Sequence, residues 1–127
     1  MAIIEKQRFG NEDLVEAVNL IGDVKGKCAL IVDDEIGTCG TVIAASKILT
    51  KFGVKKIYCC AVHPVFSGNA PDSLRESDIE EIIVTDTLPV PPRKMIPNLK
   101  VVSVSDMLGE AISRIHAGLS VGAMFGH

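Results

Sequence analysis

Apolar residues in this 127-residue chain fall into short continuous runs that are separated by polar loops. Runs at 28–32 and 57–62 consist entirely of apolar residues, and a shorter one covers 82–84. Runs of this length, bounded by polar residues, are typical of strands that are buried on both faces of a parallel sheet. They predict strands at 28–32, 56–62 and 82–84, and the sequence Lys-Val-Val-Ser-Val predicts a fourth at 100–104.

Helical spacing of apolar residues occurs between these strands. One helix is predicted by the apolar positions Val42, Ala45, Ile48, Leu49 and Phe52. It is expected to stop at Gly53, because glycine suits a left-handed C-terminal cap. A short helix beginning on proline is expected at 71–76. Ser105 is the expected N-cap of a last helix that ends near Gly118 and has Leu108, Ala111, Ile112 and Ile115 on one face.

Two other stretches are less regular. Four prolines between 88 and 97 predict an extended connection that enters neither a helix nor a central strand. Before Gly22, the apolar positions fit either a helix or a strand that runs into a turn, and periodicity leaves both open. The alternation of strands and helices predicts an α/β fold with a parallel sheet flanked by helices, and residues 1–127 are expected to form a single domain.

Composition narrows the classes of function. The apolar fraction of 47% and the charged fraction of 23% are those of a globular protein, and no apolar run approaches the length of a membrane-spanning helix. The N-terminus lacks the pattern of a secretory signal, so a cytoplasmic location is expected. A net charge of −3 and an aromatic content of 4% argue against a nucleic-acid partner.

Cysteine and histidine give no sign of a metal site. The four cysteines form no Cys-x-x-Cys pair, and the three histidines stand at no ligand spacing from them. We therefore expect no zinc and no protein-bound metal centre, and we interpret most of the cysteines as small buried apolar residues. His63 is more simply explained as a structural histidine than as a general base.

The loop after the first predicted strand is the main candidate site. Asp33 and Asp34 follow the strand, and the loop before the next helix contains two glycines and two threonines: Gly37, Thr38, Gly40 and Thr41. Glycines, hydroxyls and a helix N-terminus can hold a phosphate, while the two carboxylates suit sugar hydroxyls. The pattern is that of a ribose phosphate site, although a simple glycine-rich connection fits the composition equally well. It matches neither the P-loop nor the dinucleotide fingerprint.

Several separated motifs together resemble one family. They include Val32-Asp-Asp with Thr38-Cys-Gly-Thr41, Ile21-Gly-Asp-Val-Lys-Gly26, Phe66-Ser-Gly68 and Val84-Thr-Asp-Thr-Leu-Pro89. Ala2-Ile-Ile-Glu-Lys-Gln-Arg8 near the start, and Ser120-Val121 with Phe125 near the end, complete the set. In this order they resemble the C-terminal half of ribose-phosphate pyrophosphokinases, also called phosphoribosyl pyrophosphate synthetases, over essentially the whole chain.

The resemblance implies a type I phosphoribosyltransferase-like fold, and it favours a strand and turn before Gly22. It implies a reaction in which pyrophosphate passes from ATP to ribose 5-phosphate with Mg²⁺, giving phosphoribosyl pyrophosphate for nucleotide biosynthesis. By position, Lys6 and Arg8 match catalytic cations. A larger set matches the ribose 5-phosphate site: Arg8, Asp33, Asp34, Gly37, Thr38, Cys39, Gly40 and Thr41. Ser120, Val121 and Phe125 resemble part of an effector site.

Three residues depart from the family pattern: Glu35 replaces an apolar residue, Gly37 replaces an Asp or Ser, and Pro64 replaces a glycine. The family's Mg²⁺ ligands and most of its ATP site belong to the other half of the enzyme. The chain alone is therefore expected to be weakly active or inactive, and to form a homo-oligomer or associate with synthetase subunits. An alternative is a non-catalytic homologue that binds ribose phosphate and regulates synthetase subunits.

Overall fold

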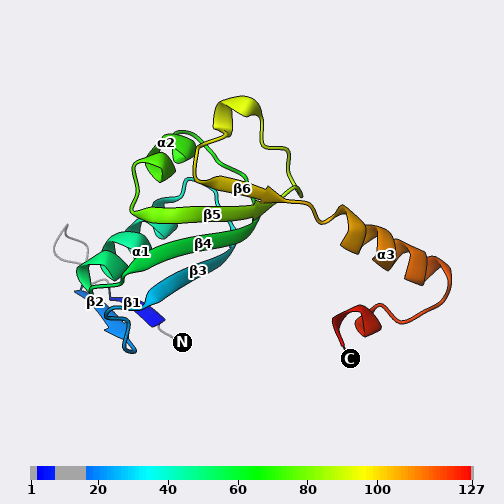
Figure 1. The fold of residues 1–127 in the computed structure, drawn as a ribbon, viewed down its shortest axis with the longest axis horizontal. Helices are drawn as coiled ribbons and strands as arrows, with labels where there is room; N and C mark the ends of the chain where they lie inside the picture. Colours follow the sequence, from blue (N-terminus) through cyan, green and yellow to red (C-terminus); the bar gives the residue numbers. More distant parts are fainter. Residues whose placement is uncertain (1–2, 8–16, 127) are drawn as a thin grey trace.

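The computed structural model describes residues 3–7 and 17–126 of the chain (Figure 1). Strands and α-helices follow one another in the order β1 Ile3–Gln7, β2 Ala17–Ile21, β3 Cys28–Glu35, α1 Gly40–Lys51, β4 Lys56–His63, α2 Ala70–Arg75, β5 Ile79–Thr85, β6 Leu99–Val102 and α3 Ser105–His116. Two 3₁₀ turns, Pro92–Lys94 and Gly122–Phe125, complete the described part.

Strands β3 to β6 form a four-stranded sheet in the order β3-β4-β5-β6, and every neighbouring pair is parallel. This confirms the predicted α/β fold with a parallel sheet. The strands differ from the prediction at their ends, since β3 continues to Glu35 and β6 stops at Val102. The prediction of burial on both faces is wrong for β3, where Leu30 and Val32 are exposed. Parallel strands place all their carboxyl ends at one edge, and Asp33 and Asp34 lie within the last residues of β3.

The ambiguous stretch before Gly22 is a strand where the structure describes it. Residues 17–21 form β2, which pairs antiparallel with β1 in a separate two-stranded sheet; Ile3 lies opposite Ile21 and Lys6 opposite Val18. Gly22 then takes a positive φ of 114°, which glycine adopts without strain. The strand and turn are confirmed for these residues, and the helix alternative is wrong there.

Helices α1 and α2 lie together over one face of the sheet (Figure 1). Their buried side chains, Val42 and Leu49 from α1 and Leu74 from α2, pack into one core with alternate residues of the strands. The strand residues in this core are Ile57, Cys59, Ala61, Ile79, Ile82, Val84 and Leu99. Because successive strand residues point to opposite faces, the other face carries the remaining apolar side chains, and several of these are exposed.

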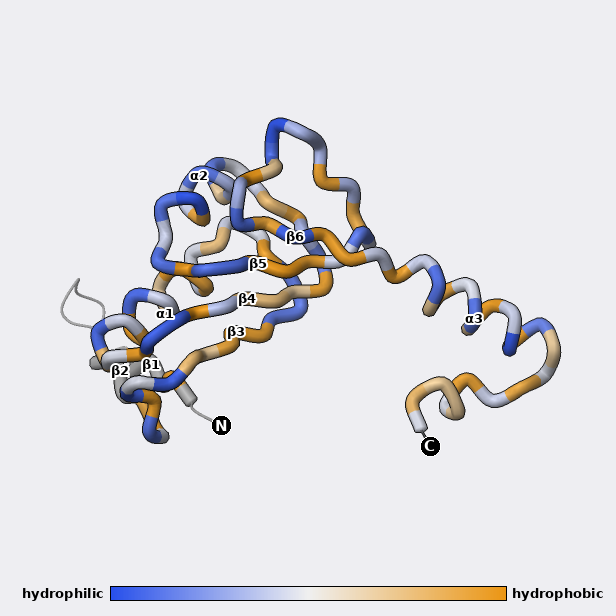
Figure 2. Tube along the Cα trace, in the orientation of Figure 1, coloured by the Kyte–Doolittle hydropathy of each residue, from blue (hydrophilic) through white to orange (hydrophobic). Residues whose placement is uncertain are grey.

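Helix α3 leaves the end of β6 and extends away from the sheet (Figure 1). Its apolar positions, which Figure 2 shows as separate orange segments, are exposed, including Leu108, Ile112 and Ile115. The predicted N-cap is wrong by one residue: Val104 is the cap, and Ser105 is the first helical residue. No helix in the described ranges is both long and apolar enough to cross a bilayer.

The proline-rich connection is not extended throughout. Pro92–Lys94 form one 3₁₀ turn, in which the Lys94 N–H donates to the Pro91 carbonyl at 2.8 Å. Proline is tolerated in the first turn of a helix because its missing N–H would have no partner there. The prediction that this stretch enters no helix is therefore wrong at these three residues.

Candidate functional site

A cavity of about 270 Å³ lies at the carboxyl end of β3, where the strand turns into α1. Its lining comes from one continuous segment: Asp33, Asp34, Glu35, Ile36, Gly37, Thr38, Cys39, Gly40, Thr41 and Val42. Seven of these are residues for which the resemblance implies ribose 5-phosphate binding. The fold thus brings both carboxylates and the whole glycine and threonine loop to the same cavity.

The start of α1 faces this cavity with unused backbone donors. The first hydrogen bond of the helix runs from the Ile43 N–H to the Cys39 carbonyl at 2.9 Å. The N–H groups of Gly40, Thr41 and Val42 precede it and have no acceptor within the helix. No side chain of the described residues caps this helix start. Free N–H groups and the positive end of the helix dipole favour an anion at this position.

Cys39 is a buried residue of the loop that lines the cavity. Its backbone adopts the left-handed region with φ 61°, and its side chain is only 5% exposed. The Sγ atom lies 3.7 Å from the Ala70 carbonyl of α2, and burial raises the pKa of the thiol. The thiol therefore belongs to the core, and Cys39 can offer a bound anion its backbone N–H but not its side chain.

The two aspartates keep acceptor capacity for a ligand. The Asp34 N–H donates to Asp33 Oδ1 at 2.9 Å, and the Glu35 N–H donates to Asp34 Oδ1 at 2.9 Å. Each carboxylate therefore uses one oxygen to order the end of the strand, and its second oxygen remains available for hydroxyl groups. Asp33 is half-buried, whereas Asp34 is exposed.

Two of the departures from the family pattern are neighbours in space. Glu35 Oε1 stands 3.9 Å from the position that a Cβ on Gly37 would occupy. The missing side chain and the additional carboxylate thus lie on the same side of the loop. The distance is an ordinary van der Waals contact, so the loop has room for a small side chain at Gly37.

A second loop, which follows β4, forms backbone hydrogen bonds with the loop that lines the cavity. The Ile36 N–H donates to the His63 carbonyl at 3.0 Å, the Phe66 N–H donates back to the Ile36 carbonyl at 2.8 Å, and the Ser67 N–H donates to the Gly37 carbonyl at 2.9 Å. Phe66 is 1% exposed and has a φ of 47°, an unusual value for a residue other than glycine. Its burial and these hydrogen bonds hold the strained backbone.

Polar residues at the carboxyl ends of β4 and β5 lie at the same edge of the sheet as the cavity. His63 Nδ1 lies 2.9 Å from Thr87 Oγ1, and the hydroxyls of Thr85 and Thr87 both donate to the Val62 carbonyl. The resemblance implies no site role for Thr85 or Thr87, although Thr-Asp-Thr directly after an apolar strand is a local signal for polar side chains at this edge. The interpretation of His63 as a structural histidine agrees with its contact to Thr87.

Other candidate residues lie elsewhere or outside the described part. Lys6 belongs to β1, where only its backbone is described, and Arg8 lies outside the described residues. Ser120, Val121 and Phe125 follow α3, far along the chain from the cavity (Figure 1). Ser120 accepts a 3.2 Å hydrogen bond at its carbonyl from Arg114 Nη1, and Phe125 is exposed. The structure does not bring these three to the cavity.

A metal held mainly by protein ligands has no support in the described ranges, which contain no group of three or more His, Cys, Asp and Glu side chains suited to one. Mg²⁺ is commonly bound by one or two carboxylates together with substrate phosphates and water. The Asp33 and Asp34 pair beside the loop at the start of α1 fits that kind of site.

Comparison with known proteins gives a consistent result. A family model described as "Phosphoribosyl synthetase-associated domain" matches residues 12–126. The chain is 50% identical over 125 residues to the ribose-phosphate pyrophosphokinase of Gloeobacter violaceus, covering 98% of this chain and 37% of that protein. It is 48% identical to the protein of the same name from Caldanaerobacter subterraneus, covering 98% of this chain and 39% of that protein.

A solved structure agrees with the sequence matches. The fold superposes with a TM-score of 0.84 on the crystal structure of phosphoribosylpyrophosphate synthetase from Mycobacterium smegmatis, at 36% identity. The match covers 92% of this chain and 37% of that one. The chain therefore spans less than two fifths of the length of each of these relatives.

Proposed function

Because the chain belongs to the family of the phosphoribosyl synthetase-associated domain, we propose that it is the ribose 5-phosphate-binding part of a ribose-phosphate pyrophosphokinase. Such an enzyme transfers the pyrophosphoryl group of ATP to the 1-hydroxyl of ribose 5-phosphate and so makes phosphoribosyl pyrophosphate. In this proposal residues 1–127 act as one domain that binds the sugar phosphate acceptor.

The cavity at the end of β3 is the observation that carries this proposal. The backbone donors at the start of α1 and the hydroxyls of Thr38 and Thr41 would hold the 5-phosphate. Asp33 and Asp34 would accept hydrogen bonds from the ribose hydroxyls, as the free oxygens of these carboxylates allow. Hydrogen-bond donors for a phosphate lie beside two carboxylate acceptors. This arrangement matches a ligand that carries both a phosphate and several hydroxyl groups.

The chemical step would rest on cations gathered around the transferred group. Transfer of a phosphoryl-type group between oxygens depends mainly on positioning and on stabilisation of the developing negative charge. Lys6 would supply a point charge and Arg8 a planar donor fork, while bound Mg²⁺ would neutralise the phosphates of ATP. Ser120, Val121 and Phe125 are proposed as part of an effector site. The protein ligands of Mg²⁺ and most of the ATP site would come from polypeptide that this chain does not contain.

The proposal also concerns assembly and location. We expect the chain to act in a homo-oligomer or together with synthetase subunits. The cytoplasm is the proposed location, although a relative from Arabidopsis thaliana that is 43% identical is named chloroplastic.

Ligand-dependent melting tests the binding role. Ribose 5-phosphate at one hundred times its dissociation constant should stabilise the fold by about 2.7 kcal/mol, which raises the melting temperature by several degrees. Ribose without phosphate and inorganic phosphate without sugar should each give a smaller shift at the same concentration. An unchanged melting temperature at millimolar ribose 5-phosphate would contradict the proposal.

A second candidate function is regulation of intact synthetase subunits, and the exposed apolar side of α3 favours it. Mixing the chain with the intact Gloeobacter violaceus enzyme separates the two functions. Co-elution with a changed rate of phosphoribosyl pyrophosphate formation would support regulation. An unchanged rate together with separate elution would exclude the regulatory function.

A further inference from the structure

The peptide group between Val65 and Phe66 is hydrogen-bonded at both ends. Its N–H, which belongs to Phe66, donates to the Ile36 carbonyl at 2.8 Å. Its carbonyl, which belongs to Val65, accepts a hydrogen bond from Lys94 Nζ at 3.2 Å. Lys94 ends the 3₁₀ turn between β5 and β6, 29 residues later in the chain. The ammonium group of a distant connection therefore contacts the loop that follows β4.

The orientation of this peptide group is unusual. The φ angle is the rotation about the N–Cα bond, so the φ of 47° at Phe66 describes how the Val65–Phe66 peptide is turned. A bulky residue keeps a positive φ only where the surrounding structure holds it. Phe66 is 1% exposed, which fixes the ring. The hydrogen bond from Lys94 fixes the carbonyl of the rotated peptide, so Lys94 stabilises this backbone conformation.

The next peptide group lies in the loop that lines the cavity. The Ile36 carbonyl, which accepts from Phe66, belongs to the same peptide group as the Gly37 N–H. The carbonyl and the N–H of a trans peptide point in opposite directions, so the Gly37 N–H points away from Phe66. This N–H makes no hydrogen bond to another described residue, and Gly37 lines the cavity. It is therefore available to donate to an anion there.

The charge of Lys94 strengthens this donor. A hydrogen bond from an ammonium group draws electron density toward the Val65 oxygen and makes the Phe66 N–H more acidic. Hydrogen-bonded peptide groups polarise one another, so the same effect passes through the Ile36 carbonyl to the Gly37 N–H. Arg93, the neighbouring cation on the same turn, is exposed and makes no hydrogen bond within the described ranges.

We propose that Lys94 is a positioning residue for the phosphate of the bound sugar phosphate. It orients and polarises the Gly37 N–H through two successive peptide groups and does not touch the ligand. The inference rests on the proposed function. It assigns part of the affinity of that site to a half-buried residue that does not line the cavity.

Calorimetric titration with ribose 5-phosphate tests this role. Lys94→Met keeps the unbranched stem and removes the charged donor, so it should weaken binding about fivefold, the effect of one typical hydrogen bond. Lys94→Arg, which keeps a charged donor, should retain most of the affinity. Arg93→Met removes the same charge one residue away and should bind normally. Lys94→Gln, a neutral donor, should also weaken binding and replaces Lys94→Met if that variant does not fold.

Nuclear magnetic resonance of the ligand-free chain gives a second measurement. The amide resonances of Gly37 and Phe66 should shift in Lys94→Met and stay in place in Arg93→Met. Denaturation is followed in parallel, because a contact that only stabilises the fold would lower the free energy of unfolding and leave the affinity of the folded chain unchanged. That result would overturn the proposal.

Three other outcomes also overturn it. Equal losses of affinity in Lys94→Met and Arg93→Met would assign the effect to net charge. A Lys94→Arg variant as weak as Lys94→Met would show that the charged donor is not the property that matters. A Gly37 amide that does not respond to Lys94→Met would break the connection through the two peptides. If the unsubstituted chain itself fails to bind ribose 5-phosphate, the proposed function fails, whereas normal binding without an effect of Lys94 refutes this inference alone.

Discussion

The carboxylate of Asp86, just after β5, accepts a 2.9 Å hydrogen bond from the N–H of Val104, the N-cap of α3, 18 residues later in the chain. This bond links the residue that follows β5 to the start of α3. A hydrogen bond from Ser103 and the one from Val104 lower the pKa of Asp86 below its ordinary value of 3.8.

The Asp86 contact predicts a pH dependence at the start of α3. A carboxyl whose pKa is lower in the folded state stabilises the fold above its unfolded pKa, and the contribution is lost as the pH falls through the folded value. We therefore expect the Val104 amide resonance to be constant near neutral pH and to shift only below about pH 3.8. Asp86→Asn should remove the titration. A midpoint above 3.8 would contradict the assignment.

Asp33→Asn should weaken ribose 5-phosphate binding about tenfold or more, because a hydrogen bond to a charged acceptor contributes about 1.5–3 kcal/mol. The amide oxygen can still accept from the Asp34 N–H, so the loop should keep its conformation. Calorimetric titration measures the change. Asp106→Asn on α3 is the matched control and should bind normally. Equal affinity of the Asp33 variant and the control would remove Asp33 from the site.

Gly37→Ser should strengthen ribose 5-phosphate binding. The nearest heavy atom to an added Cβ is Glu35 Oε1 at 3.9 Å, so the side chain fits, and its hydroxyl can donate to the phosphate. A net gain of about 1 kcal/mol corresponds to roughly fivefold in the dissociation constant. Gly37→Ala, which adds the same Cβ without a donor, should leave the affinity nearly unchanged. If both variants bind alike, the hydroxyl makes no contact with the ligand.

Leu74→Ala and Leu108→Ala should differ sharply in their effect on the free energy of unfolding. Leu74 of α2 is 0% exposed, and its truncation should cost about 2–5 kcal/mol. Leu108 of α3 is 50% exposed, so the same truncation should change stability by roughly 0.5 kcal/mol or less. Chemical denaturation of both variants measures this. A similar loss in each would mean that α3 packs against the core.

Cysteine reactivity should follow burial. Cys28 is exposed, whereas Cys59 is fully buried and burial raises its pKa to about 12. At pH 8, an alkylating reagent should therefore modify Cys28 first and Cys59 only after unfolding, because the thiolate is the reactive form. Mass spectrometry of digested samples identifies the modified sites. Cys28→Ser should eliminate the fast reaction, and early modification of Cys59 would refute the burial argument.

The apolar runs of the sequence determined the parallel sheet. A run in which every position is apolar, such as Cys28–Val32, is recognisable locally as a strand of a parallel sheet. The spacing of Val42 and Leu49 likewise predicted α1, because a helix returns to the same face every three to four residues. The loop residues that line the cavity at the end of β3 were also identifiable, since the strand end, the glycines and the helix start are contiguous in the chain.

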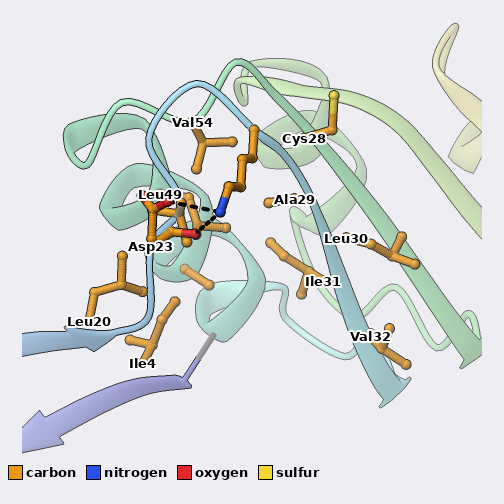
Figure 3. Close-up of a pocket in the computed structure, with 13 residues that line it drawn as sticks. Ile4, Leu20, Asp23, Cys28, Ala29, Leu30, Ile31, Val32, Leu49 and Val54 are labelled. Carbon is orange, nitrogen blue, oxygen red and sulfur yellow. Dashed lines mark hydrogen bonds and ion pairs between the residues drawn. The ribbon is translucent and has the colours of Figure 1, made fainter. Parts of the chain in front are cut away.

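Only the tertiary structure decided which apolar surfaces are covered. Periodicity shows that Leu108 and Ile112 share one side of a helix, but it does not show that this helix extends away from the sheet (Figure 1) and leaves that side exposed. The exposure of Leu30 and Val32 on β3 (Figure 3) has the same origin. The apolar run 28–32 has the composition of an interior strand, but the strand order places β3 at the edge of the sheet. Long-range hydrogen bonds, such as that from Phe66 to Ile36, depend on the whole chain, because no local pattern encodes which loops meet.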